Sequence, residues 1–464
     1  MSFAYMTALE LKDLLARGSI SPVELVADTL ARQEALEPRI NAFVTATPEV
    51  ALAAARAQER AIAAGEGGAI AGLPVSVKDL VAMAGVPLTF GSRPFADNVA
   101  DADAPAVERI REAGGCIVGK TTTSEFGCKA VCDSPLTGIT RNPWDLEKTS
   151  GGSSGGAGAS VAAGLTPFAL GTDGGGSVRI PSALCGLFGI KAQFGRVPVF
   201  PVSAAPTLSH VGSMARTVRD AALLLGVMAG HDRRDAFGVA EPTPDFLAAC
   251  DAGADGMRIA WSPTFGYAAP EPEVAALCEA AARRFEELGC SVELVEDALG
   301  TDPVEIWMAE FYGGIGTKLK DLMAEKPEEL DPAVVATLGA GLDRSMVAYF
   351  EQLFARYEFR ERMRQLFERY DLLLSPTLPC AAFEAGRDTP PGHAARNIVS
   401  WVYYTYPFNL TGQPAASIPA GFTEGGLPVG LQMVAGINRE VDILRAAAAY
   451  EEAAPWADRR PPLG

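Results

Sequence analysis

The sequence predicts an α/β protein whose large mixed β-sheet is covered by helices on both faces. Short apolar segments typical of buried strands alternate with longer segments of helical periodicity over most of the chain. Such alternation places helices against both faces of a sheet. The hydrophobic fraction of 48% is ample for a large core. Because no internal repeat or low-complexity tail interrupts the chain, we expect residues 1–464 to form a single domain.

The expected elements follow in order along the chain. Ser21-Pro22-Val23-Glu24 is a capping box with proline at the first helical position, so a helix begins there. Helices are expected over about 7–17, 21–36, 48–64, 104–113, 157–165, 217–229, 272–288 and 440–453. Strands are expected over about 41–45, 73–79, 116–118, 168–170, 185–191, 258–261, 291–295, 371–375, 417–419 and 429–433. Residues from about 300 to 370 are expected to form a variable, mostly helical region on the substrate side.

Composition excludes several classes of function. The net charge of −18 argues against nucleic-acid binding, which needs concentrated lysine and arginine. The eight cysteines are scattered and do not form a disulfide framework. The N-terminus lacks the pattern of a signal peptide, and no apolar stretch approaches the roughly 18 residues of a membrane span. We therefore expect a cytoplasmic protein that binds neither nucleic acid nor membrane.

Residues 114–121 match the phosphate-loop pattern G-x-x-x-x-G-K-[ST] letter for letter. A nucleotide-binding protein is therefore one alternative. A phosphate loop follows a strand, however, and here a helix precedes Gly114 while Cys116-Ile117-Val118 is itself strand-like. We interpret the match as a helix end followed by a strand.

Two glycine-serine clusters mark the expected reactive centre. Residues 151–156 and 174–177 flank a small-residue helix and a short buried strand. Glycines allow the backbone to approach a ligand closely, and successive N–H groups can turn toward one point. The second cluster can therefore form an oxyanion hole beside Ser177.

A nucleophilic serine also needs a base. The chain has three histidines, of which His210 is the credible candidate, and no nucleophile elbow of the G-x-S-x-G type is followed by a suitable acid and histidine. Lysine can serve when burial keeps it neutral. Lys78 ends an apolar strand and is the best-placed lysine, with Lys191 in reserve.

These residues resemble the motifs of the amidase signature family. The resemblance is carried by two glycine-serine clusters, by a lysine strand and by two further segments, and it covers most of the chain. The matching segments are Gly151-Gly152-Ser153-Ser154-Gly155-Gly156, Gly171-Thr172-Asp173-Gly174-Gly175-Gly176-Ser177-Val178-Arg179-Ile180-Pro181-Ser182, Leu73-Pro74-Val75-Ser76-Val77-Lys78-Asp79, Thr140-Arg141-Asn142-Pro143-Trp144 and Gly412-Gln413-Pro414-Ala415.

The resemblance implies the amidase signature fold and a Ser-cisSer-Lys triad. Ser177 would be the nucleophile, Ser153 a relay serine after a cis peptide bond, and Lys78 the base. The resemblance further implies an oxyanion hole made by the N–H groups of Gly174, Gly175, Gly176 and Ser177. Three residues would support the loop, namely Ser154, Asp173 and Arg179. No metal or cofactor is implied.

The chain departs from amidotransferase relatives at residues 128–132, where it has Cys-Lys-Ala-Val-Cys. Cys128 and Cys132, four residues apart, could suggest a metal or redox pair, but no further cysteine or histidine completes a site, so we favour a pocket wall. Aromatic residues offer further candidates. The candidate pocket residues are Cys128, Cys132, Phe311, Tyr312, Trp401 and Tyr404.

The expected function is hydrolysis of the C–N bond of a small, aryl or bulky apolar carboxamide through an acyl-enzyme, with esters or carbamates as further substrates. The alternatives are the amidase component of a tRNA-dependent amidotransferase, the nucleotide-binding protein and an inactive scaffold. The expected partners are the amide substrate, water and a second copy of the chain in a homodimer.

Overall fold

The protein is built on one mixed sheet of 11 strands. The computed structural model describes residues 3–393 and 397–463. The strand order is β1-β3-β2-β8-β10-β9-β14-β15-β13-β11-β12. β2 runs parallel to β3 and β8, and β11 runs parallel to β12 and β13, whereas the other pairs are antiparallel. The predicted α/β class with a mixed sheet is confirmed.

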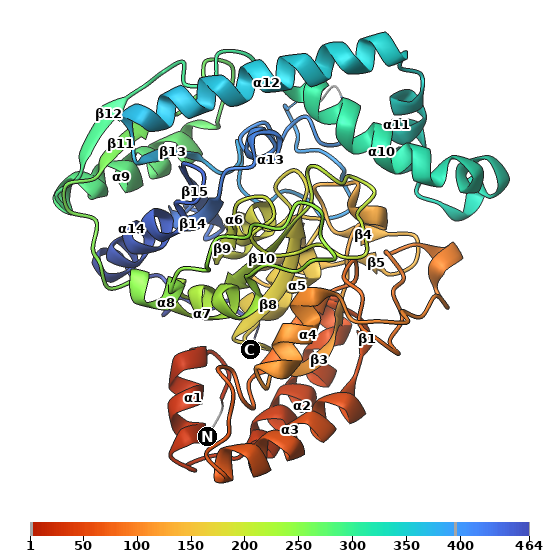
Figure 1. The fold of residues 1–464 in the computed structure, drawn as a ribbon, viewed down its shortest axis with the longest axis vertical. Coiled ribbons are helices and arrows are strands. Elements are labelled where there is room, and N and C mark those ends of the chain that lie inside the picture. Colours follow the sequence, from red (N-terminus) through yellow and green to blue (C-terminus); the bar gives the residue numbers. More distant parts are fainter. Residues whose placement is uncertain (1–2, 394–396, 464) are drawn as a thin grey trace.

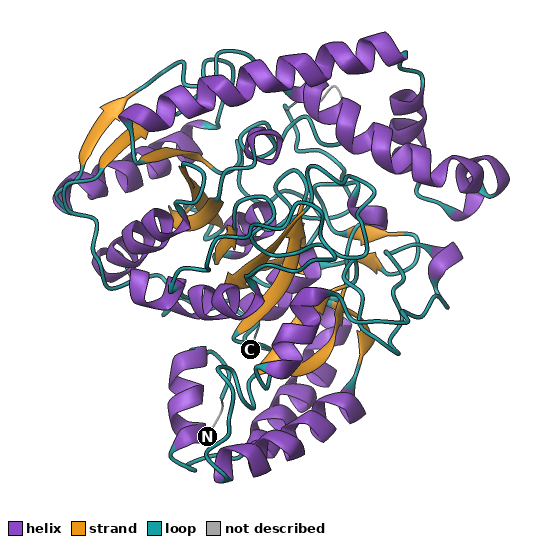
Figure 2. Ribbon diagram, in the orientation of Figure 1, coloured by secondary structure: helices purple, strands orange, loops and turns teal. Residues whose placement is uncertain are grey.

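Helices and strands alternate through most of the described chain (Figure 2). The helices are α1 Ala8–Ala16, α2 Pro22–Ile40, α3 Pro48–Ala63, α4 Pro105–Glu112, α5 Gly155–Ala162, α6 Arg179–Cys185, α7 Val218–Met228, α8 Phe246–Ala249, α9 Pro272–Glu287, α10 Val304–Glu325, α11 Pro332–Leu342, α12 Met346–Arg369, α13 Pro407–Thr411 and α14 Glu440–Ala453. The strands of the large sheet are β1 Phe43–Ala46, β2 Pro74–Lys78, β3 Cys116–Thr121, β8 Phe168–Asp173, β9 Phe188–Lys191, β10 His210–Ala215, β11 Arg258–Trp261, β12 Ser291–Leu294, β13 Leu372–Pro376, β14 Ala415–Phe422 and β15 Pro428–Ala435. Two small hairpins pair β4 Asp133–Ser134 with β5 Gly138–Ile139, and β6 Arg141–Asn142 with β7 Asp145–Thr149.

Alternate side chains along the strands enter different cores, because successive residues of a strand point to opposite faces. In β13, Leu372 and Leu374 belong to the core cluster that includes residues of α7, α9 and α14, whereas Leu373 belongs to the cluster that includes residues of α6 and α10. Both faces of the sheet are therefore buried. In Figure 1, α10, α11 and α12 lie together at one end of the molecule, opposite α1–α3. No helix in residues 3–393 or 397–463 is long and apolar enough to cross a bilayer.

Two strands of the large sheet differ from the sequence expectation. The segment 185–191 does not form one strand, because α6 continues to Cys185, Gly186 turns in the left-handed region and β9 begins at Phe188. β10 was not expected, since Val211 is the only β-branched residue in its sequence His-Val-Gly-Ser-Met-Ala and the small residues Gly212, Ser213 and Ala215 have weak strand propensity. It is nevertheless central, paired with β8 on one side and β9 on the other.

The phosphate-loop pattern folds as β3. Gly119, Lys120 and Thr121 lie in the strand, and the Lys120 ammonium is fully buried against the Asp79 carboxylate at 2.9 Å. This lysine cannot reach a phosphate, so the structure removes the basis for nucleotide binding at this segment.

Candidate active site

The candidate site begins where two parallel neighbours, β2 and β8, end. Lys78 is the last residue of β2, and Asp173 is the last residue of β8. The second glycine cluster follows β8 directly, and α6 begins two residues after Ser177. Parallel pairing thus brings the lysine and the glycine turn to the same edge of the sheet.

Lys78, Ser153 and Ser177 form a continuous chain of polar contacts. Lys78 Nζ lies 2.6 Å from Ser153 Oγ, and Ser153 Oγ lies 3.0 Å from Ser177 Oγ. The Gly152–Ser153 peptide bond is cis. Lys78 Nζ also donates to Thr172 Oγ1 at 2.9 Å, a contact that sequence reasoning missed. Because hydroxyl hydrogens rotate, these contacts can carry a proton from Ser177 through Ser153 to Lys78.

Burial lowers the pKa of Lys78 to about 7, although Cys132 and Asp173 nearby act in the opposite direction. The cause is desolvation, which disfavours the charged ammonium. The side chain is fully buried. A large fraction of Lys78 is therefore neutral near pH 7 and able to accept a proton.

The glycine turn presents three unengaged N–H groups. Within the described chain, the backbone N–H groups of Gly174, Gly175 and Ser177 make no hydrogen bond. The N–H of Gly176 instead donates to Asp173 Oδ1 at 2.8 Å. The structure therefore differs from the expectation of four unengaged donors, because the Asp173 carboxylate accepts from the N–H of Gly176.

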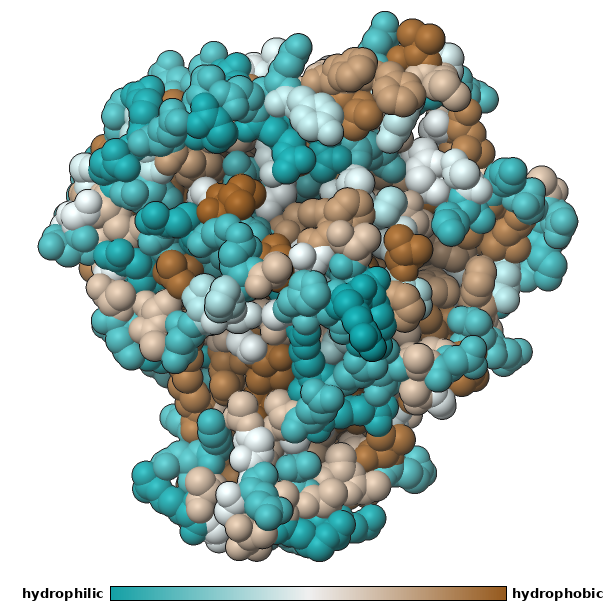
Figure 3. Space-filling view, viewed as in Figure 1, coloured by the Kyte–Doolittle hydropathy of each residue, from teal (hydrophilic) through white to brown (hydrophobic). Residues whose placement is uncertain are grey.

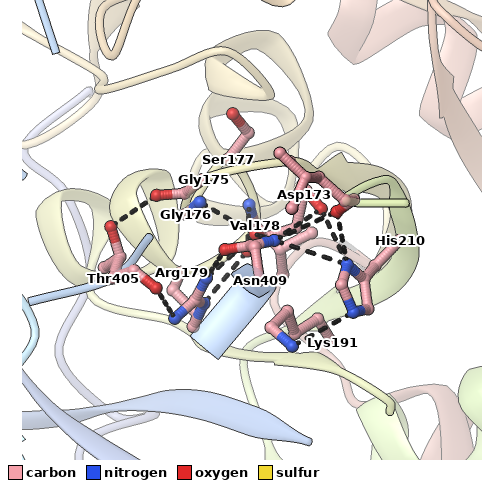
Figure 4. A network of polar contacts seen from close by, with 12 residues as sticks. Asp173, Gly175, Gly176, Ser177, Val178, Arg179, Lys191, His210, Thr405 and Asn409 are labelled. Atoms are coloured by element: carbon pink, nitrogen blue, oxygen red, sulfur yellow. Dashed lines mark hydrogen bonds and ion pairs between the residues drawn. The ribbon is translucent and has the colours of Figure 1, made fainter. Parts of the chain in front are cut away.

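A buried ion pair between Asp173 and Arg179 stabilises the glycine turn (Figure 4). Arg179 donates to both Asp173 oxygens at 2.9 and 3.0 Å, and its other donors reach Gln432 and the backbone oxygen of Thr405. Asn409 donates to Asp173 Oδ1 and accepts from Arg179. Burial alone would raise the pKa of Asp173, but Arg179 and the other donors hold it well below its usual range.

Ser154 links the two glycine-serine clusters. Its Oγ donates to the carbonyl of Thr172 at 3.1 Å and accepts from the N–H of the same residue at 3.3 Å. Its own N–H donates to the carbonyl of Ser177 at 3.3 Å. The residue thus fixes the end of β8 against the first cluster.

The two other candidate bases lie beside each other, away from the serine contacts. His210 Nε2 is 3.3 Å from Lys191 Nζ, and His210 Nδ1 is 2.7 Å from the carbonyl of Leu208 (Figure 4). Burial lowers the pKa of both groups well below its ordinary value. Neither hydrogen-bonds to Ser153 or Ser177. The structure therefore brings Lys78, and not His210 or Lys191, to the serines.

A cavity of about 350 Å³ opens over Ser153, Ser177 and Gly174. Its walls are mostly apolar. They include Leu80, Leu88, Phe90, Phe95, Phe126, Phe200, Phe311, Ile315 and Leu319. The buried Asp173 and His210 lie at its base, and the exposed Lys318 lies in its lining.

Of the six pocket residues predicted from the sequence, one lines the cavity. Phe311 lines the cavity, but Cys128, Cys132, Tyr312, Trp401 and Tyr404 do not. These five side chains are buried in the protein core, where the Tyr312 hydroxyl, for example, donates to the carbonyl of Cys128 at 3.1 Å. Aromatic residues at helical spacing are more often core than lining, and that is the outcome here.

The two cysteines do not form a pair. Both are free and buried, and burial raises the pKa of each thiol. Within the described residues, no group of three histidine, cysteine or acidic side chains is arranged to hold a metal ion.

Proteins of similar sequence indicate the class of enzyme to which the chain belongs. The chain is 37% identical over 469 residues to an acylamidase of Rhodococcus erythropolis, covering 98% of this chain and 97% of that protein. It is also 37% identical over 490 residues to a glutamyl-tRNA(Gln) amidotransferase subunit of Moorella thermoacetica, covering all of both chains. Together with the fold and site, these likenesses define an amide-hydrolysing enzyme.

Solved structures agree on the fold. A bacterial aryl acylamidase of the amidase signature enzymes superposes with a TM-score of 0.92 at 32% identity, covering 98% of each chain. A 6-aminohexanoate cyclic dimer hydrolase superposes with a TM-score of 0.90 at 30% identity, covering 99% of each chain. The Amidase family model matches residues 24–444. The protein belongs to the amidase signature family.

Proposed function

We propose that the protein hydrolyses small carboxamides carrying an aryl or bulky apolar group, through an acyl-enzyme on Ser177. The observation that carries this proposal is the contact chain from Lys78 through Ser153 to Ser177 at the base of a largely apolar cavity. Lys78 is the base, Ser153 the relay and Ser177 the nucleophile. The distances from Lys78 Nζ to Ser153 Oγ and from Ser153 Oγ to Ser177 Oγ support these three roles.

In acylation, Ser177 Oγ bonds to the substrate carbonyl carbon. Its proton passes to Ser153 as the proton of Ser153 passes to Lys78, which becomes an ammonium. When the C–N bond breaks, Ser153 gives a proton to the leaving nitrogen and recovers one from Lys78. In deacylation, water takes the place of Ser177 and bonds to the acyl carbon, while its proton passes through Ser153 to Lys78. When the bond between the acyl carbon and Ser177 Oγ breaks, Ser153 gives a proton to Ser177, which releases the carboxylic acid and restores the serine.

The tetrahedral intermediate places negative charge on the former carbonyl oxygen. The N–H groups of Gly174, Gly175 and Ser177 are the donors available to it, and one such donor is typically worth about 10²–10³ in turnover. The ion pair of Asp173 and Arg179 acts indirectly, because it holds the turn that carries these donors. Ser154 has the same supporting role.

The cavity supports an apolar substrate. A volume of about 350 Å³ falls within the range of small-molecule sites, about 300–1,000 Å³. Phe90, Phe95 and Phe126 contact one another edge-on or stacked at 5.5–6.4 Å and form an aromatic wall. An aryl group fits such a wall. Esters and carbamates of the same shape present the same carbonyl to Ser177, so we propose them as further substrates.

The amidotransferase relatives favour a second candidate, in which the chain acts on glutamine within a complex. Against it, Lys129 of the altered 128–132 segment is held in an internal ion cluster. Lys129 contacts Asp133, and it reaches Asp331 at 2.7 Å and Asp388 at 2.9 Å. Glutamine is also a poor match for a largely apolar cavity.

A substrate panel assayed on the purified chain separates the two candidates. We expect kcat/KM for aryl or bulky apolar amides to exceed that for glutamine at least 100-fold without any partner. Ser177→Ala and Lys78→Ala should each lower kcat by several orders of magnitude, with unchanged circular dichroism. Glutamine hydrolysis as the main activity, or a loss of activity in His210→Ala equal to that in Lys78→Ala, would contradict the proposal.

A further inference from the structure

The first half of α12 carries a concentrated exposed apolar surface, which we call the α12 patch. It consists of Met346, Val347, Tyr349, Phe350, Phe354 and Tyr357. Met346 is 76% exposed, Val347 is 69% exposed, and Phe354 and Tyr357 are each 62% exposed. Figure 3 shows hydrophobic colours over the end of α12 next to α11 and hydrophilic colours along the rest of the helix. Scattered single apolar residues are ordinary on a surface, but a contiguous patch marks an interaction site.

The helix is held firmly in this orientation by its other face. Arg356, Phe359 and Met363 are buried. Arg356 donates to the carbonyl of Leu410 at 2.7 Å and to Thr207 Oγ1 at 2.9 Å, and it pairs with Glu310 of α10. The contacts of the buried face therefore fix which side chains of α12 are exposed.

The patch has the spacing of a helix–helix seam. Val347, Phe350, Phe354 and Tyr357 follow one another at intervals of three, four and three residues, the a and d positions of two heptads. This spacing reads the same from either end. Two antiparallel copies of α12 related by a two-fold axis would therefore place Val347 opposite Tyr357 and Phe350 opposite Phe354.

The size of the patch suits a dimer. From the exposed fractions, and with about 150–250 Å² for a whole aromatic side chain, the six residues expose on the order of 700 Å². A stable interface of standard size buries about 800 Å² per partner. The patch alone supplies most of that area.

The negative charge of the chain argues against binding of the α12 patch to a lipid surface. The net charge of −18 opposes approach to anionic membranes, and Glu351 and Glu358 border the seam. We propose that the α12 patch is the interface of a two-fold symmetric homodimer formed by antiparallel pairing of α12. Through Arg356, Glu310 and Thr207, the paired helix also braces α10, which carries the cavity residue Phe311.

Molar mass in solution tests the proposal. Light scattering during size-exclusion chromatography should give twice the chain mass of 48.6 kDa for the wild type at micromolar concentration. Phe354→Glu should raise the dimer dissociation constant at least 100-fold and elute as a monomer. Leu294→Glu is the matched control, because Leu294 is 57% exposed on β12, outside the patch, and this variant should remain dimeric. A monomeric wild type, or a dimeric Phe354→Glu, would overturn the proposal.

Crosslinking tests the pairing itself without depending on Phe354→Glu folding. The eight native cysteines are buried, so they contribute little background. The double variant Val347→Cys/Tyr357→Cys should form a disulfide-linked dimer on mild oxidation, because each new thiol faces the other residue of its partner. Neither single variant should do so. Equal crosslinking of the single variants, or none in the double variant, would overturn antiparallel pairing at this surface.

Discussion

Thr172 offers a direct way to move the pKa of the proposed base. Its hydroxyl accepts a hydrogen bond from Lys78 Nζ at 2.9 Å and is half-buried at the end of β8. Thr172→Asp would put a carboxylate at that contact and stabilise the ammonium. An opposite charge this close typically shifts a pKa by about 1–3 units. The pKa of Lys78 should therefore rise from about 7 to roughly 8–10.

The assay is kcat/KM measured from pH 5.5 to 10 with one aryl amide. Since Lys78 must be neutral to accept a proton, wild-type activity should rise tenfold per pH unit below about 7 and level off above it. In Thr172→Asp the whole curve should move to higher pH by about 1–3 units, with loss at neutral pH and recovery near pH 10.

Thr172→Asn is the matched control, because it keeps a polar group at the contact without adding charge. Its midpoint should stay within about half a unit of the wild type, since it adds none of the opposite charge that shifts a pKa. The same midpoint in Thr172→Asp and Thr172→Asn would refute Lys78 as the titrating base, and so would wild-type activity that falls between pH 6 and 8.

Two further substitutions test the support of the site and its specificity. Asp173→Asn leaves the fully buried Arg179 without its carboxylate and should lower the free energy of unfolding in urea by about 3–5 kcal/mol; a loss below 1 kcal/mol would contradict the bracing role. Phe311→Ala enlarges the cavity beside Gly174, so the ratio of kcat/KM for a bulkier acyl group to that for a small one should rise about tenfold. An unchanged ratio across a series of acyl sizes would place the acyl group elsewhere.

The fold and the meeting of Lys78, Ser153 and Ser177 at one site could be predicted because their signals are local. Apolar strand segments, capping boxes and glycine turns each depend on a few neighbouring residues. The lysine at the end of β2 and the serines of the two glycine clusters are recognisable by motif. β10 was missed because its small residues have weak strand propensity and its place in the sheet is decided by pairing with β8 and β9.

The cavity could not be predicted because its wall is assembled from distant segments. Phe90 and Phe126 come from loops after β2 and β3, Phe200 from the loop after β9, and Phe311 from α10. Nothing in the sequence signals that these side chains share one space. The engagement of the Gly176 N–H by Asp173 is likewise a matter of atomic geometry within a turn that the motif describes only by residue type.

The central claim is that Ser177 is the nucleophile activated through Ser153 by Lys78. The most direct test is to treat the purified protein with a fluorophosphonate probe and locate the adduct by peptide mass spectrometry. A single adduct on Ser177, formed at a rate that falls steeply in Lys78→Ala and is lost in Ser177→Ala, is the predicted result. An adduct on Ser153 or any other serine, or labelling of Ser177 at an unchanged rate in Lys78→Ala, would contradict the account.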